Sequence, residues 1–248
     1  VRACLDHRDL TLDDVDAVTI PFDPSLLMNV EPAFFTEMLR TGQSISRKAY
    51  LISKGALDFG KKRLATVDIV RERLSTLGEV PPIETYGHHK THAASAFYPS
   101  QFSEALVLTI DGKGEYDSTV VWRGTTDGLE RIRTYEHPNS LGRLYGIITS
   151  YLGYRPNNGE GKIMGLAPYG SENDEIRTTL ESLGVTGVDY DVTDVTSGGI
   201  QNGLAKLEDH FGRPARDGGG KFSEWEQDLA YETQSLLEQI VCSITEHY

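Results

Sequence analysis

Residues 87–98 read GHHKTHAASAFY, and residues 105–115 read ALVLTIDGKGE. On a helix, side chains four positions apart share a face, so His88 and His92 can direct their imidazoles at one point. The apolar run 105–110 predicts a buried strand that ends at Asp111. Two histidines and a carboxylate suit iron, zinc or manganese, although buried histidines with structural roles are also common. We expect His89, between them, to point elsewhere.

The segments around this stretch predict its setting. Residues 83–86 form a short strand that leads into a helix starting near His88, and Pro99 stops that helix. Beyond it, residues 105–110, 118–123 and 129–137 have strand character, and the Gly- and Asp-rich segments between them are typical of hairpin turns. The sequence therefore predicts an antiparallel meander that follows the histidine helix.

Two glycine-rich segments have two interpretations each. Residues 111–115, DGKGE, suit either a simple hairpin turn or a loop whose backbone amides approach a phosphate. Ser140 can cap a following helix, after which residues 159–162, GEGK, suit either a solvated helix start or an anion site with Lys162 in the first turn.

The remaining elements follow in order along the chain. We expect a helix tail at residues 1–5, a strand at 17–20, two or three helices within 31–74 broken at Gly42 and Gly60, a helix at 171–183, a loop-rich stretch at 184–220 with 188–192 as its best strand candidate, and an amphipathic helix at 222–246. This order predicts an α/β chain of the duplicated ATP-binding fold shared by actin, heat-shock chaperones and sugar kinases, truncated at both ends. Residues 1–100, with a helical insertion, would then end the first subdomain, and residues 101–248 would begin the second.

Bulk properties exclude some classes of protein. The 248 residues carry a net charge of −13 with 24 basic and 37 acidic side chains, which disfavours general binding to nucleic acid or to anionic membranes. No stretch approaches a membrane span. Cys4 and Cys242 lie in expected helices, where we predict that they pack in the interior rather than form a disulfide, so a cytoplasmic location is expected.

Four segments together carry a resemblance to a known family. Residues 88–100, 109–115, 140–145 and 159–170 resemble the NodU/CmcH family of O-carbamoyltransferases, in order and at matching spacings. The resemblance implies a TsaD-like domain of the actin-like ATPase superfamily and a YrdC-like domain outside residues 1–248. In such enzymes the YrdC-like domain makes carbamoyl-adenylate from carbamoyl phosphate and ATP, and the TsaD-like domain transfers the carbamoyl group to a substrate hydroxyl.

The resemblance also implies roles for single residues. His88, His92 and Asp111 match the metal ligands of the family, where the metal, similar to Fe(II), clamps the nucleotide phosphate, and a further aspartate is expected beyond Tyr248. The phosphate-proximal glycines match Gly112 and Gly114. The second glycine-rich motif matches Gly161 and Lys162. The family's opening hairpin, with its His-Asp pair, has no match here, so the sequence assigns no catalytic base.

We therefore expect a fragment of an O-carbamoyltransferase, inactive alone and completed by a YrdC-like domain. Its expected ligands are carbamoyl phosphate, ATP and a small-molecule hydroxyl acceptor, with a second copy of the chain as a candidate partner. The alternative is a non-catalytic metal- and nucleotide-binding subunit of the TsaD type that acts with partner proteins.

Overall fold

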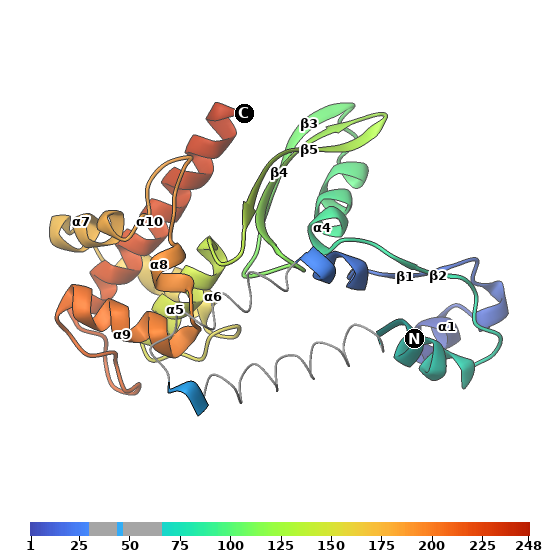
Figure 1. The fold of residues 1–248 in the computed structure, drawn as a ribbon, viewed down its shortest axis with the longest axis horizontal. Coiled ribbons are helices and arrows are strands. Elements are labelled where there is room, and N and C mark those ends of the chain that lie inside the picture. The colour runs from blue at the N-terminus through green and yellow to red at the C-terminus, as the bar shows by residue number, and fades with distance from the viewer. Residues whose placement is uncertain (30–43, 47–65) are drawn as a thin grey trace. The chain divides into compact units, whose positions relative to one another are not determined.

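The computed structural model describes residues 1–29, 44–46 and 66–248, and Figure 1 shows their arrangement into helices and strands. The fold is mixed α/β with parallel and antiparallel pairing, which confirms the predicted class at that level. The duplicated actin-like architecture stays a prediction. The elements that the structure describes are α1 (Arg2–His7), η1 (Leu12–Asp14), β1 (Val18–Ile20), η2 (Pro24–Asn29), β2 (Ile83–Thr85), α4 (His88–Phe97), η3 (Tyr98–Ser100), β3 (Glu104–Ile110), β4 (Asp117–Thr125), β5 (Gly128–Glu136), α5 (Leu141–Tyr151), α6 (Glu160–Leu166), η4 (Ala167–Tyr169), α7 (Asp174–Ser182), α8 (Thr193–Thr196), α9 (Ile200–Phe211) and α10 (Glu224–His247).

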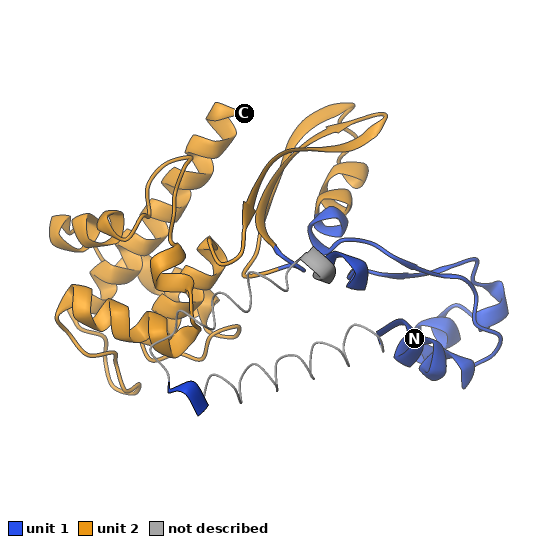
Figure 2. Cartoon of the chain, viewed as in Figure 1, with its two compact units in different colours: residues 1–92, 114–116 blue, residues 93–113, 117–248 orange. Residues whose placement is uncertain are grey.

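The chain divides into two compact units, coloured separately in Figure 2. Unit 1 comprises residues 1–92 and 114–116, and unit 2 comprises residues 93–113 and 117–248. The division falls inside α4, after His92. The boundary that we expect at residue 100, between two subdomains of the duplicated fold, stays a prediction.

Unit 1 contains the parallel pair of strands. β1 and β2 lie at the two predicted strand positions, and they pair in parallel with Val18 opposite Ile83. Residues 66–75 are helical, and Leu74 is buried. The other helices predicted within 31–74, and their breaks at Gly42 and Gly60, lie outside the described residues.

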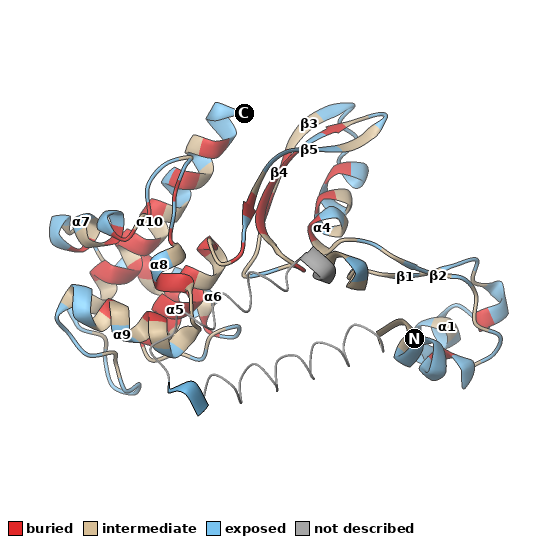
Figure 3. Cartoon of the chain, in the orientation of Figure 1, coloured by how far each residue is buried: buried red, intermediate tan, exposed pale blue. Residues whose placement is uncertain are grey.

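The predicted meander is confirmed in unit 2. β3, β4 and β5 form an antiparallel sheet with β4 in the centre. Gly128, with φ of 133°, begins β5 in a conformation that favours glycine. Because β4 lies between two partners, most of its residues are buried (Figure 3).

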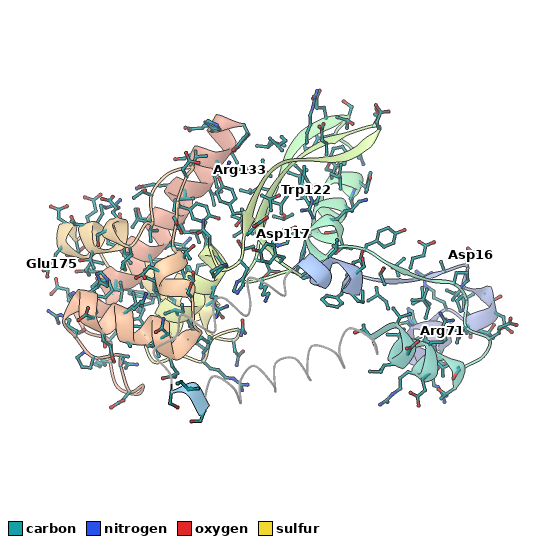
Figure 4. The ribbon with its side chains drawn as sticks, viewed as in Figure 1. Asp16, Arg71, Asp117, Trp122, Arg133 and Glu175 are labelled. Carbon is teal, nitrogen blue, oxygen red and sulfur yellow. The ribbon has the colours of Figure 1, made fainter. Side chains whose placement is uncertain are left out.

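Both faces of this sheet are covered. Alternate side chains of a strand point to opposite faces. Val107, Val120 and Trp122 pack with Ala93 and Phe97 of α4, and Figure 4 labels Trp122 beside that helix. On the other face, the side chains that join the main helical core of unit 2 are Leu106, Leu108, Ile110, Val121 and Tyr135.

Helices α5 and α10 supply many of the buried residues of that core (Figure 3). As predicted, Ser140 caps α5, and its side-chain oxygen accepts a hydrogen bond from the amide of Arg143. Ser223 and Glu226 form a capping box at the start of α10. None of the described helices combines the length and the apolar character of a membrane span.

The prediction for residues 184–220 is wrong in two respects. The stretch contains α8 and the 12-residue helix α9, whose Leu207 is fully buried, so it is no loop-rich excursion. The strand predicted at 188–192 is absent from this described segment. Instead, the side chain of Asn139 donates to the carbonyl of Tyr190 and accepts from the amide of Val192. The side-chain amide of Asn139 thus makes hydrogen bonds of the kind that a neighbouring strand would make.

The prediction that the cysteines pack in the interior is also wrong. Cys4 and Cys242 are both free thiols and both exposed. On α10 the buried residues include Ile240 and Ile244, and a residue two positions from each of these lies on a different face of the helix. The predicted absence of a disulfide between the two cysteines agrees with the structure.

Candidate functional site

The two histidines of the predicted metal site lie at the start of α4. Their Nε2 atoms are 3.1 Å apart, and the rings meet nearly edge to face, with centroids 4.5 Å apart. Two nitrogens bound to one cation at about 2.1 Å lie about 3.0 to 3.4 Å apart in octahedral or tetrahedral geometry. The pair therefore fits a shared metal, although a hydrogen bond between one protonated and one bare nitrogen fits the same distance.

Glu115 fixes the first turn of this helix, a role that the sequence analysis missed. Its side chain is buried, and the carboxylate accepts hydrogen bonds from the amides of His88, at 3.0 and 3.1 Å, and of Asp23, at 2.8 Å. A carboxylate is favourable at a helix N-terminus because the unpaired amides there carry partial positive charge. Glu115 therefore sets the direction in which α4, with its histidines, begins.

Gly114 makes this arrangement sterically possible. A Cβ atom at this position would lie 2.8 Å from Cδ2 of His89, which is itself buried. That separation is shorter than real Cβ contacts, so a larger residue would displace the loop or the histidine ring. Gly114, which is predicted to lie near a phosphate, thus also allows the loop to pack closely against the start of α4.

Asp111 stands immediately after β3, as predicted. Its amide still pairs with the carbonyl of Ser118 in the strand ladder, and its Oδ1 accepts from the amide of Gly112 at 2.6 Å. The hydroxyl of Ser140 lies 3.1 and 2.9 Å from the carbonyl oxygens of Asp111 and Gly112, and can donate to either. The cap residue of α5 thereby holds the loop that carries the aspartate.

Asp111, the third predicted ligand, belongs to unit 2, whereas His88 and His92 belong to unit 1. A metal site shared by these three residues stays a prediction. Two imidazoles and a carboxylate are hard-to-borderline donors, which suits a divalent transition metal.

The second glycine-rich motif lines a different cavity from the first. Gly161 lines a cavity of about 310 Å³ together with Leu141 and Gly142, whereas Gly112 and Gly142 line a neighbouring cavity of about 510 Å³. The two cavities therefore share Gly142. Lys162 is exposed, and its ammonium lies 4.8 Å from the centroid of the Tyr154 ring, a cation–π contact.

A family model described as the carbamoyltransferase N-terminus matches residues 1–247. The chain belongs to this carbamoyltransferase family. Nodulation protein NolNO of Sinorhizobium fredii is 30% identical over 258 residues, which cover 100% of this chain and 33% of that protein. Nodulation protein NolO of Bradyrhizobium diazoefficiens is 32% identical over 163 residues, which cover 65% of this chain and 28% of that protein.

An uncharacterized protein of Synechocystis sp. matches over a similar extent. It is 32% identical over 252 residues, which cover 97% of this chain and 40% of that protein. The chain thus spans less than half the length of each of these relatives. The match to the family confirms the resemblance that the four sequence motifs indicated.

Proposed function

We propose that this domain takes part in an O-carbamoyltransferase reaction, as the metal- and phosphate-binding part of a longer enzyme. Membership of the carbamoyltransferase family supports carbamoyl transfer in general. The observation that carries the finer proposal is the pair of His88 and His92 at the start of α4, whose Nε2 atoms lie 3.1 Å apart. This pair supports the proposal that the domain holds a metal which in turn binds a phosphate.

In the proposed reaction, carbamoyl-adenylate is the donor and a substrate hydroxyl is the acceptor. The hydroxyl oxygen attacks the carbamoyl carbon, a new C–O bond forms, and the bond from that carbon to the phosphate oxygen breaks, so AMP leaves. The hydroxyl proton passes to a base that is not assigned to any residue of this chain. A YrdC-like domain would supply the carbamoyl-adenylate from carbamoyl phosphate and ATP.

The residues of this chain would act on the phosphate. His88, His92 and Asp111 would hold Fe(II) or another divalent cation, which when bound neutralises phosphate charge and improves AMP as a leaving group. The amides of the loop at Gly112 and Gly114 would approach the phosphate oxygens, as glycine allows. Gly161 and Lys162 would act from the adjoining cavity. The actin-like duplicated fold is part of this proposal, because it is an ATP-binding architecture.

The metal site is tested by single substitutions in the full-length protein. We expect His88→Ala and Asp111→Ala each to abolish stoichiometric metal, because the loss of one ligand from the expected set leaves a divalent cation weakly held. Iron and zinc content per chain is the measurement. His210→Ala on α9 is the control, since that exposed histidine belongs to no such group among the residues that the structure describes. Undiminished metal in both ligand variants would refute the assignment.

The reaction itself requires a separate test. The full-length protein, incubated with ATP, carbamoyl phosphate and candidate hydroxyl compounds, should release AMP and yield a carbamoylated product by mass spectrometry. If metal and nucleotide bind but no acceptor is carbamoylated, the alternative of a non-catalytic subunit of the TsaD type is favoured.

A further inference from the structure

The carboxylate of Glu115 joins two segments that follow the parallel strands of unit 1. The chain after β1 and the chain after β2 each give one backbone amide to this carboxylate. The amide of Asp23 lies 2.8 Å from Oε1, and the amide of His88 lies 3.0 Å from Oε2 and 3.1 Å from Oε1. Residues 114–116 are themselves part of unit 1, as Figure 2 shows. One side chain thus holds two segments of this unit together.

The two amides compensate the charge of a buried carboxylate. Glu115 is only 5% exposed, and among the described residues no lysine or arginine pairs with it. A buried charge is costly unless its hydrogen bonds are kept, and bonds from amides to an ionised acceptor are roughly twice as strong as neutral ones. The contact therefore resists displacement of the segments that carry Asp23 and His88.

Glu115 also acts as the cap of α4. Gly87, which precedes the helix, has no side chain that could accept a first-turn amide. His88 is the first residue of α4, and His92 follows one turn later on the same face. A change in the first turn therefore moves both imidazoles.

The histidine pair tolerates little displacement if it binds a metal. Its Nε2 atoms are 3.1 Å apart, within the separation of about 3.0 to 3.4 Å that a shared cation requires. Ligands of a functional site must be held within about 0.5 Å of the productive geometry. A shift of that size at the start of α4 would take the pair out of range.

We propose that Glu115 is a positioning residue for the metal that His88 and His92 would bind, and that its carboxylate, by holding both amides, sets the metal affinity. The inference rests on the proposed function and extends it, because it assigns a role to a residue outside the expected ligand set. A role in folding alone would lower stability and leave the metal site unchanged.

The test begins with Glu115→Gln in the full-length protein. Glutamine keeps the size of the side chain but removes its charge, and its amide nitrogen cannot accept a hydrogen bond. We expect this substitution to weaken binding of Zn²⁺ about 10- to 100-fold, the usual effect of losing a residue that orients a metal ligand. Competition with a chromogenic chelator is the measurement.

The visible spectrum of bound Co²⁺ reports the coordination geometry separately from affinity. We expect Glu115→Gln to change this spectrum even at concentrations of Co²⁺ that saturate the site, because the two imidazoles are then oriented differently. A residue needed only for folding would leave the spectrum of the folded protein unchanged.

Glu208→Gln is the matched control. Glu208 on α9 also accepts a backbone amide, that of Ala215 at 2.8 Å, but it belongs to unit 2. We expect this substitution to leave the Zn²⁺ affinity and the Co²⁺ spectrum unchanged. Thermal unfolding establishes that each variant folds. If the glutamine variant does not fold, Glu115→Asp carries the test, and it should also weaken Zn²⁺ binding because the shorter side chain cannot reach both amides.

Wild-type affinity and an unchanged Co²⁺ spectrum in folded Glu115→Gln protein overturn the inference, while the metal site stands. Equal losses of affinity in Glu115→Gln and Glu208→Gln overturn it too, because the effect is then not specific to the start of α4. A wild-type protein that binds neither Zn²⁺ nor Co²⁺ refutes the proposed metal site itself, and the positioning role falls with it.

Discussion

Gly142 shows how a single missing side chain shapes the site. A Cβ atom at this position would lie 2.7 Å from the carbonyl carbon of Asp111 and 2.7 Å from the amide nitrogen of Gly112. These are backbone atoms, so the clash cannot be relieved by rotating a side chain. The first turn of α5 can approach the loop that carries the predicted metal ligand only because residue 142 is glycine.

We therefore expect Gly142→Ala to lower the free energy of unfolding by about 1–3 kcal/mol, the usual cost of overpacking, and to reduce metal content by moving Asp111. Urea denaturation and metal analysis are the measurements. Gly161→Ala is the control: outside its own helical turn, no atom of the described residues lies within 4 Å of a Cβ there, and the residue is helical. Alanine at that position should be neutral or stabilising by up to about 1 kcal/mol. Equal losses in both variants would contradict the steric explanation.

At the scale of elements, two carboxylates four residues apart on α10 anchor the start of α7. Asp228 accepts from the amide of Ser171 at 2.9 Å and from the side chain of Asn173 at 3.2 Å. Glu232 accepts from the amide of Asn173 at 2.7 Å, and its other oxygen lies 2.8 Å from the guanidinium of Arg177. The helical period of α10 thus places both acids where the chain enters α7.

Arg177→Ala should lower the free energy of unfolding by about 3 kcal/mol, because it leaves the fully buried Glu232 without its cation. Arg123→Ala gives the comparison, since the side chains of Arg123 and Glu104 are 55% and 60% exposed. An exposed pair typically contributes less than about 1 kcal/mol. Chemical denaturation of both variants measures the difference, and equal losses would show that burial of Glu232 has no energetic weight.

The elements that the sequence predicts correctly are specified by residues close to them in the chain. The meander has alternating side chains and glycine-rich turns, and α5 has Ser140 as its cap, so each is specified within a few residues. Tyr190 is different: its ring stacks on Tyr135 at 4.6 Å, and its hydroxyl bonds Thr119. These contacts join residues more than fifty positions apart, and they hold 188–192 as a loop although its side chains resemble those of a strand.

For the whole molecule, sequence motifs indicated the family and the three candidate ligands, because those residues stand at fixed points of a helix and a strand end. The residues that hold the neighbouring helix starts in place could not be predicted in the same way. Glu115 ends the glycine-rich segment, and its local sequence does not indicate that it is buried against the start of α4. Arg143 and His137 lie six residues apart on either side of a helix cap, and only the folded chain shows their contact.

Three buried tyrosines make the stability of the protein vary with pH in the alkaline range. Desolvation raises the pKa of Tyr145 to about 12, with a smaller contribution from Glu160, and likewise raises that of Tyr151 to about 12. Burial also raises the pKa of Tyr190. The unfolded chain releases these protons near pH 10, the ordinary tyrosine pKa, whereas the folded chain retains them.

Between pH 10 and about 12 the folded state therefore binds more protons than the unfolded state, so the free energy of unfolding falls as pH rises through this window. Below pH 10 both states keep these protons, and the tyrosines cause no change of stability with pH. The urea concentration at the midpoint of unfolding, measured from about pH 8 to 11.5, should stay constant at first and then decline. Replacing Tyr145 by Phe should make the decline shallower, because one fewer buried phenol then resists ionisation. An equally steep decline in that variant would mean that other groups cause the alkaline loss.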